Sequence, residues 1–177
     1  MIEKWSQIYR KGCQKRSNFL ASVSWMSPHG LLATWFGFGL LVPAPGTWGT
    51  LGGLLFGLLL TTFLPVWSLL VWATALFLAG LWATNKIEQK SREHDSRFIV
   101  IDEVAAILLV MGAGPNSLTV AYTVAGFLAF RFFDVIKPWP VSWADTHISG
   151  ALGVMLDDIL AALYAIGSIY FIGWVLS

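Results

Sequence analysis

The sequence predicts an all-α fold, a polytopic membrane helical bundle. Three stretches of the chain contain no Asp, Glu, Lys or Arg, and they cover residues 17–85, 104–130 and 159–177. Charged residues make up 12% of the chain, against about 25% in a typical soluble domain, and the mean hydropathy is +0.69. Helices in such stretches lack the polar face that a water-soluble surface helix needs. We therefore expect several helices to cross a membrane.

Residues 1–28 are expected to form a basic arm, and residues 29–177 a single membrane domain. Five Lys or Arg residues and one acidic residue lie within the first 16 positions of the arm. Anionic lipid headgroups attract such a segment, so we expect the arm to lie on the membrane surface. Residues 31–42 are apolar but too short to cross about 30 Å of hydrocarbon, which takes roughly 20 helical residues. This N-terminal segment is expected to be re-entrant or interfacial.

A short Pro/Gly loop is expected at residues 43–50, because its prolines and glycines oppose a continuous helix. Two helices, 51–64 and 66–84, should follow and meet at Pro65, before a charged loop over residues 85–98. The third apolar segment covers residues 99–111 and ends in a Gly/Pro turn at 112–116. A fourth helix over 118–136, a polar connection over 137–150 and a last helix over 151–175 complete the predicted bundle.

The basic residues predict the orientation of these helices. The arm and the 85–98 loop together hold nine of the eleven Lys and Arg residues, and Arg131 and Lys137 are the other two. Basic residues favour the cytoplasmic side of a membrane. We therefore expect the starts of the third and last helices and the end of the fourth helix to meet at the cytoplasmic face.

This topology brings the ionisable residues of three helices to one depth. The acidic residues are Asp102 and Glu103 in the third helix, Asp134 in the fourth, and Asp157 and Asp158 in the last. Arg131, Asp134 and Lys137 are spaced by three, so they share one helical face. Ionisable groups at membrane depth face partners or a water-filled cavity, and we expect a shared polar pocket.

The composition of this pocket predicts phosphate chemistry. Carboxylates that lie close together in a low dielectric repel one another and need a cation, and oxygen ligands favour Mg²⁺. Arg131 and Lys137 would supply donors to a phosphate. The Pro/Gly loop would add backbone N–H groups, and Thr47 and Thr50 would add hydroxyls. Together these groups suit phosphoryl transfer or hydrolysis.

Each feature also has a structural interpretation that the sequence leaves open. Arg131 and Asp134 suit an intrahelical ion pair, and Asp102 and Glu103 suit the start of a helix, where the helix dipole favours anions. Glycines such as Gly46 and Gly49 would also permit close helix packing. The Asp157–Asp158 pair is harder to explain structurally, because it lies past the first turn without an adjacent basic residue.

Four motifs resemble the phosphatidylglycerophosphatase A family, and the resemblance runs in order from about residue 29 to residue 171. They are Val-Pro-Ala-Pro-Gly-Thr-Trp-Gly-Thr at 42–50, Ile-Asp-Glu at 101–103, Phe-Arg-Phe-Phe-Asp-Val-Ile-Lys-Pro-Trp-Pro at 130–140 and Asp-Asp-Ile-Leu-Ala at 157–161. The third motif followed by the Asp-Asp pair is the most specific part of this resemblance.

The resemblance implies a Mg²⁺-dependent, multi-pass phosphatase of the bacterial cytoplasmic (inner) membrane, with its active site facing the cytoplasm. Such an enzyme removes the terminal phosphate of the phospholipid phosphatidylglycerophosphate to give phosphatidylglycerol. The matching positions imply catalytic and metal-binding roles for Asp102, Glu103, Asp134, Asp157 and Asp158. They imply substrate contacts for Pro45, Gly46, Thr47, Gly49, Thr50, Arg131 and Lys137. Either a metal-activated water or an aspartate would attack phosphorus.

Other functions remain as alternatives. A small membrane cation carrier or channel would also use intramembrane carboxylates, although Arg131 and Lys137 would repel its cation. A phosphatidyltransferase acting on CDP-linked lipids needs spaced aspartates on one helix, which are absent, and a noncatalytic scaffold is a further alternative. The net charge of +1 gives no reason to expect nucleic acid as a partner. Membrane lipids are the other expected partners, and the oligomeric state is undefined by the sequence.

Overall fold

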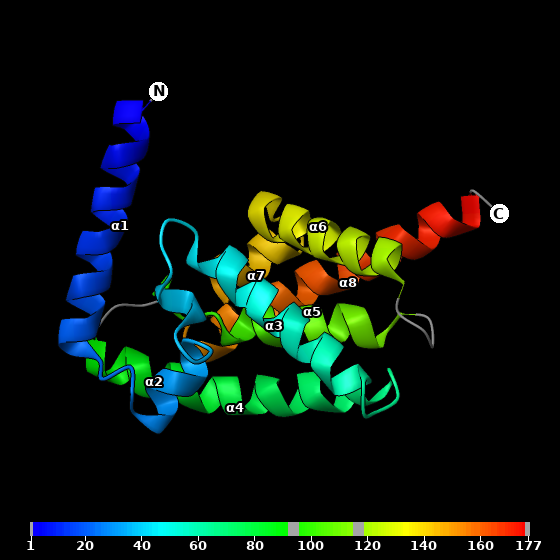
Figure 1. The fold of residues 1–177 in the computed structure, drawn as a ribbon, viewed down its shortest axis with the longest axis horizontal. Helices are drawn as coiled ribbons and strands as arrows, with labels where there is room; N and C mark the ends of the chain where they lie inside the picture. Colours follow the sequence, from blue (N-terminus) through cyan, green and yellow to red (C-terminus); the bar gives the residue numbers. More distant parts are fainter. Residues whose placement is uncertain (1, 92–95, 115–118, 176–177) are drawn as a thin grey trace.

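The computed structural model is helical, which confirms the all-α prediction. It describes residues 2–91, 96–114 and 119–175, and no strand occurs among them. The longest helices of the bundle run side by side along the long axis of the molecule (Figure 1). They are α3 (Pro45–Thr61), α4 (Ser68–Ser91), α5 (Ile101–Gly112), α6 (Val120–Ile136) and α8 (Ala151–Val175).

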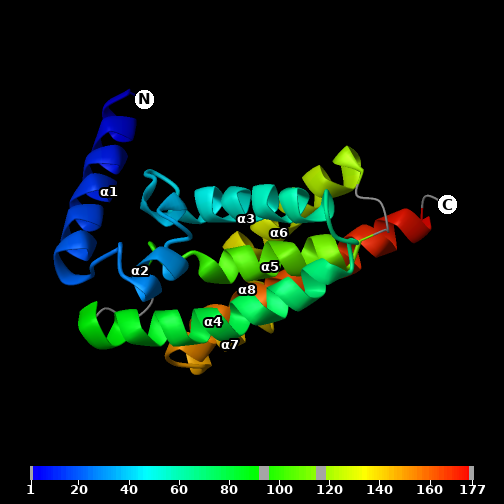
Figure 2. The ribbon, with the colours of Figure 1, turned by 60° about the horizontal axis from the view of Figure 1, so that its bottom comes forward.

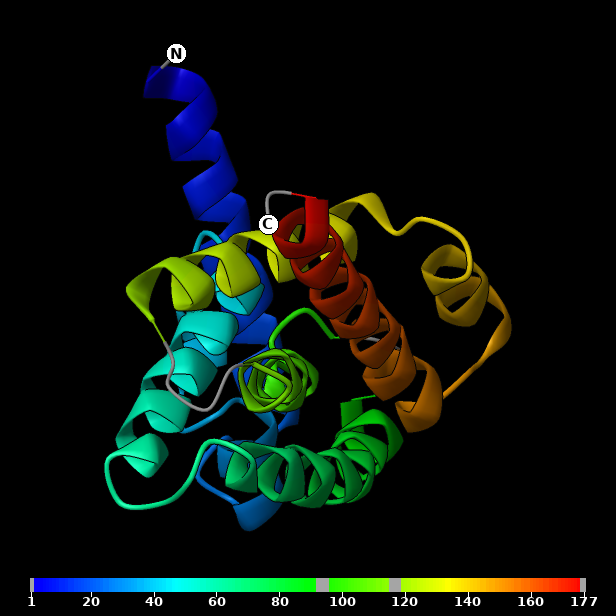
Figure 3. The same cartoon turned by 90° about the vertical axis from the view of Figure 1, so that its right-hand side faces the viewer.

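Helix α5 lies at the centre of the bundle, surrounded by α3, α4, α6 and α8 (Figure 3). Ile101, Val104 and Leu108 are completely buried, as are most other residues of this helix. With 12 residues, α5 is about 18 Å long at 1.5 Å per residue. Its bounds lie within two residues of the predicted third segment, because an apolar run with charged residues at its start marks a buried helix well.

The expected Pro/Gly loop at residues 43–50 is wrong, because α3 already begins at Pro45. Proline suits the first position of a helix, where its missing N–H has no helical partner and its φ is already near the helical value. Glycine at position 49 serves close packing of α3 against α5. A Cβ there would collide with Val100 and lie 2.9 Å from a carboxylate oxygen of Glu103.

Residues 31–42 do not form one continuous helix. They contain the end of α2 (Pro28–Ala33), a turn, and the short 3-10 helix η1 (Phe38–Leu40). Ser27 caps α2, since its hydroxyl accepts a hydrogen bond of 3.2 Å from the Gly30 N–H. This segment is too short to cross a membrane as a helix, in line with the sequence prediction. Its re-entrant or interfacial position stays a prediction.

The basic arm forms a helix, α1 (Ile2–Ser22), which projects away from the bundle (Figure 2). Its C-terminal end is anchored by Phe19, which is buried and whose ring centroid lies 5.2 Å from that of Phe98. Val23, just after the helix, is also buried. Contact of α1 with a membrane surface stays a prediction.

Two polar segments contain more helix than the sequence predicts. Helix α4 continues seven residues beyond Thr84 to Ser91, and the Gln89 side chain donates a hydrogen bond of 3.2 Å to Asn85 within this extension. The polar connection after α6 contains α7 (Val141–His147). Helix α8 has the predicted bounds. Residues 92–95 of the charged loop, and residues 115–118, which include part of the predicted turn and the start of the predicted fourth helix, lie outside the described residues.

Candidate active site

The ends of four long helices surround a polar cavity of about 500 Å³. The N-terminal ends of α3, α5 and α8 and the C-terminal end of α6 lie at the same end of the bundle, near α1 (Figure 1). All five predicted carboxylates and both predicted cations line this cavity. The charged residues that line it are Arg97, Asp102, Glu103, Arg131, Asp134, Lys137, Asp145, Asp157 and Asp158.

Helix α5 places Asp102 and Glu103 in its first turn, where unpaired backbone N–H groups and the helix dipole favour anions. Asp102 Oδ1 accepts a hydrogen bond of 3.0 Å from the Glu103 N–H. Glu103 Oε1 lies 3.2 Å from Arg131 Nη1 of α6. The second carboxylate oxygen of Glu103 is buried and has no hydrogen-bond partner. Stabilisation of the α5 N-terminus therefore explains only part of the contacts of Asp102 and Glu103, because Glu103 also pairs with Arg131 of α6.

Arg131 joins three helices at the cavity wall. Its Nη1 lies 2.7 Å from Asp134 Oδ2, one turn further along α6, and 3.4 Å from Thr50 Oγ1 in α3. Together with the contact to Glu103 of α5, a single guanidinium nitrogen faces three oxygens. The intrahelical ion pair that the sequence left open is present, and the same arginine also lines the cavity.

Lys137 ends α6 in a left-handed conformation with φ of 48°. Its Nζ donates hydrogen bonds of 2.7 Å to both Asp145 Oδ1 of α7 and Asp157 Oδ2 of α8. Burial acts to lower the pKa of this ammonium, but the two carboxylates outweigh burial and hold the pKa above its ordinary value. Lys137 therefore stays a cation while it bridges α7 and α8.

Asp157 and Asp158 are the most deeply placed acids of the last helix, with 6% and 4% of their surface exposed. Asp157 Oδ1 and Asp158 Oδ2 are buried without a hydrogen-bond partner. A buried polar atom without a partner costs roughly 1–3 kcal/mol. Both residues line the polar cavity, so each brings to it an acceptor oxygen that no described group already uses.

The N-terminal turn of α3 forms another wall of the cavity through Pro45, Gly46 and Thr47. A Cβ on Gly46 would collide with Glu103 and lie 3.2 Å from Arg131 Nη2. The first amide groups of a helix lack helical acceptors. Gly49 and Thr50 lie behind this wall, where Gly49 packs on Val100 and Glu103, and the Thr50 hydroxyl donates a hydrogen bond of 2.9 Å to the Gly46 carbonyl.

Arg97 and Asp145 line the cavity although neither was among the predicted site residues. Arg97 Nη2 donates a hydrogen bond of 2.9 Å to the Pro43 carbonyl. Its signal in the sequence was its place four residues before the buried α5. His147 of α7 is absent from the cavity lining. Its ring stacks on Trp143 with centroids 5.6 Å apart.

In the described part of the chain, no three Asp, Glu, His or Cys side chains converge closely enough to form a ready-made metal site. The donor chemistry nevertheless suits Mg²⁺, which keeps several waters and is commonly held by one or two carboxylates plus substrate phosphate. The partnerless oxygens of Glu103, Asp157 and Asp158 are the donors available for it. Asp102 and Asp134 also line the cavity.

Comparison with known proteins assigns the family. The family model for phosphatidylglycerophosphatase A matches residues 31–173. The chain is 40% identical over 150 residues to phosphatidylglycerophosphatase A of Haemophilus influenzae, covering 85% of this chain and 91% of that protein. It is 37% identical over 148 residues to phosphatidylglycerophosphatase A of Escherichia coli K12, covering 83% and 84%.

A third relative carries a different substrate in its description. The chain is 38% identical over 152 residues to a Bacteroides thetaiotaomicron protein provisionally described as a phosphatidylinositol-3-phosphatase, covering 82% of this chain and 94% of that protein. No solved structure matches the chain. The family match covers every predicted site residue and the whole polar cavity, and the chain belongs to the phosphatidylglycerophosphatase A family.

Proposed function

We propose that this protein is a Mg²⁺-dependent membrane phosphatase that removes the terminal phosphate of phosphatidylglycerophosphate and produces phosphatidylglycerol. The single observation that carries this proposal is the cavity in which Arg131 and Lys137 lie beside five carboxylates. Family membership supports the reaction type, because the curated relatives in Haemophilus influenzae and Escherichia coli are phosphatidylglycerophosphatases.

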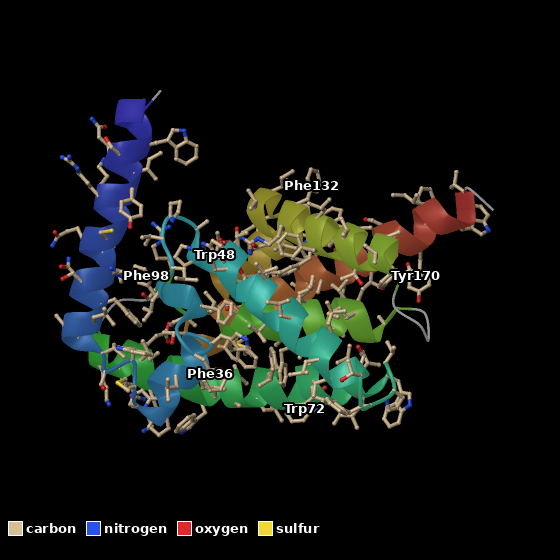
Figure 4. The ribbon with its side chains drawn as sticks, in the orientation of Figure 1. Phe36, Trp48, Trp72, Phe98, Phe132 and Tyr170 are labelled. Carbon is tan, nitrogen blue, oxygen red and sulfur yellow. The ribbon has the colours of Figure 1, made fainter. Side chains whose placement is uncertain are left out.

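The outer faces of the bundle support its insertion in a membrane. Helices α4 and α8 contain stretches long and apolar enough to cross one, at Ser68–Lys90 and Ala151–Val175. Large apolar side chains also cover the outside of the bundle. Phe132 of α6 and Trp72 of α4 point away from the bundle (Figure 4), and they are 57% and 38% exposed. A water-soluble protein rarely exposes so extensive an apolar surface.

The proposed orientation places the cavity at the cytoplasmic face of the inner membrane. Basic residues of α1 and of the C-terminal end of α4 lie at the same end of the bundle as the cavity (Figure 1). Since Lys and Arg are retained on the cytoplasmic side, this end faces the cytoplasm. In this arrangement α3, α4, α6 and α8 are in contact with lipid, and the shorter α5 is enclosed by them.

Two of the three cations that line the cavity, Arg131 and Lys137, are paired with carboxylates, so a bound phosphate must compete for them. Arg131 contacts Glu103 and Asp134, and Lys137 contacts Asp145 and Asp157. An arriving phosphate offers stronger, charge-assisted acceptors to both side chains. It therefore competes with the carboxylates, and the amide groups of Gly46 and Thr47 at the start of α3 offer further donors.

Displaced carboxylates need a positive partner, and the proposal assigns this part to Mg²⁺. Glu103 and Asp158 would hold the ion, with Asp102, Asp134 and Asp157 nearby. When bound, Mg²⁺ neutralises the charge of the carboxylates and of the phosphate oxygens and polarises the reacting phosphoryl group. Without a metal ion, the six carboxylates that line the cavity would repel an anionic phosphate.

The net reaction breaks the bond between phosphorus and the terminal glycerol oxygen. The hydroxyl of one water molecule ends on phosphorus, and its other proton goes to the glycerol oxygen. The products are phosphatidylglycerol and inorganic phosphate. Within the cavity, Arg131 and Lys137 would orient the phosphate, and Asp157, through its partnerless Oδ1, would carry the proton.

The alternative of a small cation carrier or channel is not favoured. The ionisable residues gather in a cavity at one end of the bundle, and the described residues of the cavity include Arg97, Arg131 and Lys137. A path for cations needs acidic groups across the membrane and no fixed positive charges in their way.

The test uses purified protein in detergent with phosphatidylglycerophosphate as substrate and inorganic phosphate as the measured product. We expect release with Mg²⁺ and none after treatment with EDTA, with activity restored by added Mg²⁺. Phosphatidic acid and phosphatidylinositol 3-phosphate serve as comparison substrates and should be hydrolysed more slowly. Equal release with Mg²⁺ and with EDTA would reject the metal dependence, and faster release from either comparison lipid would reject the assigned substrate.

A further inference from the structure

A second cavity, of about 550 Å³, lies on the outer side of α8 beyond the polar cavity. We call it the α8 groove. It is lined by Pro140, Leu160, Leu163, Tyr164, Gly167, Ser168 and Phe171. Its two hydroxyl groups are already used, because Tyr164 donates a hydrogen bond of 2.7 Å to the Trp139 carbonyl and Ser168 donates one of 2.7 Å to the Tyr164 carbonyl. The groove therefore offers an apolar surface.

The α8 groove continues one face of the helix that carries Asp157. From Asp157 the helix reaches Leu160, Tyr164, Ser168 and Phe171 by steps of three and four residues, which keeps them on one side. At 1.5 Å per residue, the distance from Leu160 to Phe171 is about 17 Å. The hydrocarbon layer of one leaflet is about half of the 30 Å thickness of a bilayer core, so the groove has the length of a leaflet.

The other wall makes the same transition from polar to apolar. Lys137 contacts Asp157 in the polar cavity, and Pro140, three residues later, lines the groove. Six of the seven lining residues thus belong to α8, and Pro140 lines the groove from the segment that follows Lys137. Leu163 and Phe171 in the groove are 52% and 64% exposed, so nothing in the described part of the chain covers them.

We infer that the α8 groove binds one acyl chain of the phospholipid whose phosphate occupies the polar cavity. This inference rests on the proposed function and adds a specificity site to it. A charged pocket and an apolar groove of leaflet length that follow one face of α8 fit a molecule with a charged head and a hydrocarbon tail. A chain seated along α8 would hold the phosphate near Asp157 and Lys137, which is the positioning that lets remote binding contacts speed a reaction.

Two glycines of α8 provide a matched pair of variants. A Cβ on Gly167 and a Cβ on Gly173 would both meet nothing within 4 Å. Only Gly167 lines the groove. A Gly167→Phe ring would occupy the groove, whereas a Gly173→Phe ring at the other glycine would leave it open. Neither position belongs to the polar cavity.

The experiment measures kcat/KM for a series of phosphatidylglycerophosphate analogues with acyl chains of four to eight carbons, for the original protein and for both variants. Burial of one added methylene contributes about 0.8 kcal/mol, or about fourfold in kcat/KM. We expect kcat/KM to rise with chain length in the original protein and in Gly173→Phe, since both keep the groove. The rise should flatten in Gly167→Phe, with the shortest analogue hydrolysed at the original rate.

Parallel slopes in all three proteins would overturn the acyl-chain site, because partition into detergent micelles is common to them. Should Gly167→Phe fail to fold, as judged by size-exclusion chromatography, Ser168→Leu fills the same groove and carries the same expectation. Failure of the proposed function gives a different result, since the original protein would then release no phosphate from any analogue.

Discussion

Lys137 at the end of α6 and Asp157 in α8 are joined by a hydrogen bond of 2.7 Å from Nζ to Oδ2. The other oxygen of Asp157 is buried without a partner. One carboxylate thus both pairs with Lys137, which we propose as a phosphate contact, and keeps a second oxygen that no described group uses. The first oxygen links the end of α6 to α8. Because the second oxygen contributes no hydrogen bond to the fold, we expect a change at Asp157 to affect activity more than folding.

We expect Asp157→Asn to lower kcat by at least about 100-fold, the usual effect of removing a group that transfers a proton in the reaction. The amide keeps the size of the side chain but loses the negative charge that faces the cavity. Phosphate release from phosphatidylglycerophosphate measures the effect, and the yield of protein extracted from membranes reports on folding.

Asp145→Asn is the matched control, because Asp145 accepts a hydrogen bond of the same 2.7 Å length from Lys137 but its side chain is 37% exposed. An exposed ion pair contributes about 0.2–1 kcal/mol, so the loss of activity should stay within about fivefold. Equal losses in Asp145→Asn and Asp157→Asn would contradict the distinct role of Asp157.

Arg131→Lys should reduce kcat/KM by about 100-fold although it keeps the positive charge. The Arg131 guanidinium reaches oxygens of α3, α5 and α6, and a lysine has no planar fork with which to hold two phosphate oxygens. Arg16→Lys is the control, since Arg16 contacts the Leu40 carbonyl at 3.5 Å and is absent from the cavity lining. Unchanged kinetics in Arg131→Lys would show that position 131 supplies charge alone.

Gly46→Ala should lower activity by up to about 100-fold, the effect of moving reacting groups by about 1 Å. The added methyl group would collide with Glu103 and crowd Arg131, so it must displace side chains of the cavity. Gly173→Ala at an open position of α8 is the control and should change nothing. Full activity of Gly46→Ala would mean that Glu103 is free to move without consequence.

Cys13 offers a direct test of orientation, because it is the single cysteine of the chain and is a free thiol. We expect a membrane-impermeant maleimide to label Cys13 of α1 in intact cells only after the inner membrane is permeabilised. A Cys13→Ser/Thr62→Cys variant places the thiol at the exposed, opposite end of α3. The maleimide should label that variant once the outer membrane is permeabilised, while the inner membrane is still intact. The reverse labelling pattern would invert the proposed topology.

The sequence predicted the central parts of the fold because long apolar runs with charged ends mark helices clearly. Helix α8 has the predicted bounds, and α5 begins at Ile101, within two residues of its prediction. The depth of the charged residues could be predicted from the same pattern. Successive helices run in opposite directions, so the start of one helix lies at the same end of the bundle as the end of the helix before it. For this reason Asp102, Asp134 and Asp157 were expected at one depth, and the structure places them around one cavity.

The remaining features depend on contacts that a local pattern does not contain. Pro45 and Gly49 read as loop residues, yet they start α3, because Gly49 lets that helix approach Val100. In the sequence, Arg97 is one of several cations in a charged loop. Its place in the cavity lining depends on how the segment before α5 folds, which the sequence pattern does not show. The α8 groove, likewise, depends on how residues 137–140 pack beside α8.

The most direct test of the central claim is the affinity of the purified protein for Mn²⁺, an EPR-visible substitute for Mg²⁺. The claim is that Glu103 and Asp158 hold one divalent ion beside Arg131, with Asp102 of α5, Asp134 of α6 and Asp157 of α8 around it. Asp102→Asn, Asp134→Asn and Asp157→Asn should each weaken Mn²⁺ binding by about 10- to 100-fold, while Asp145→Asn should bind as the original protein does. Unchanged affinity in all three cavity variants would contradict the claim.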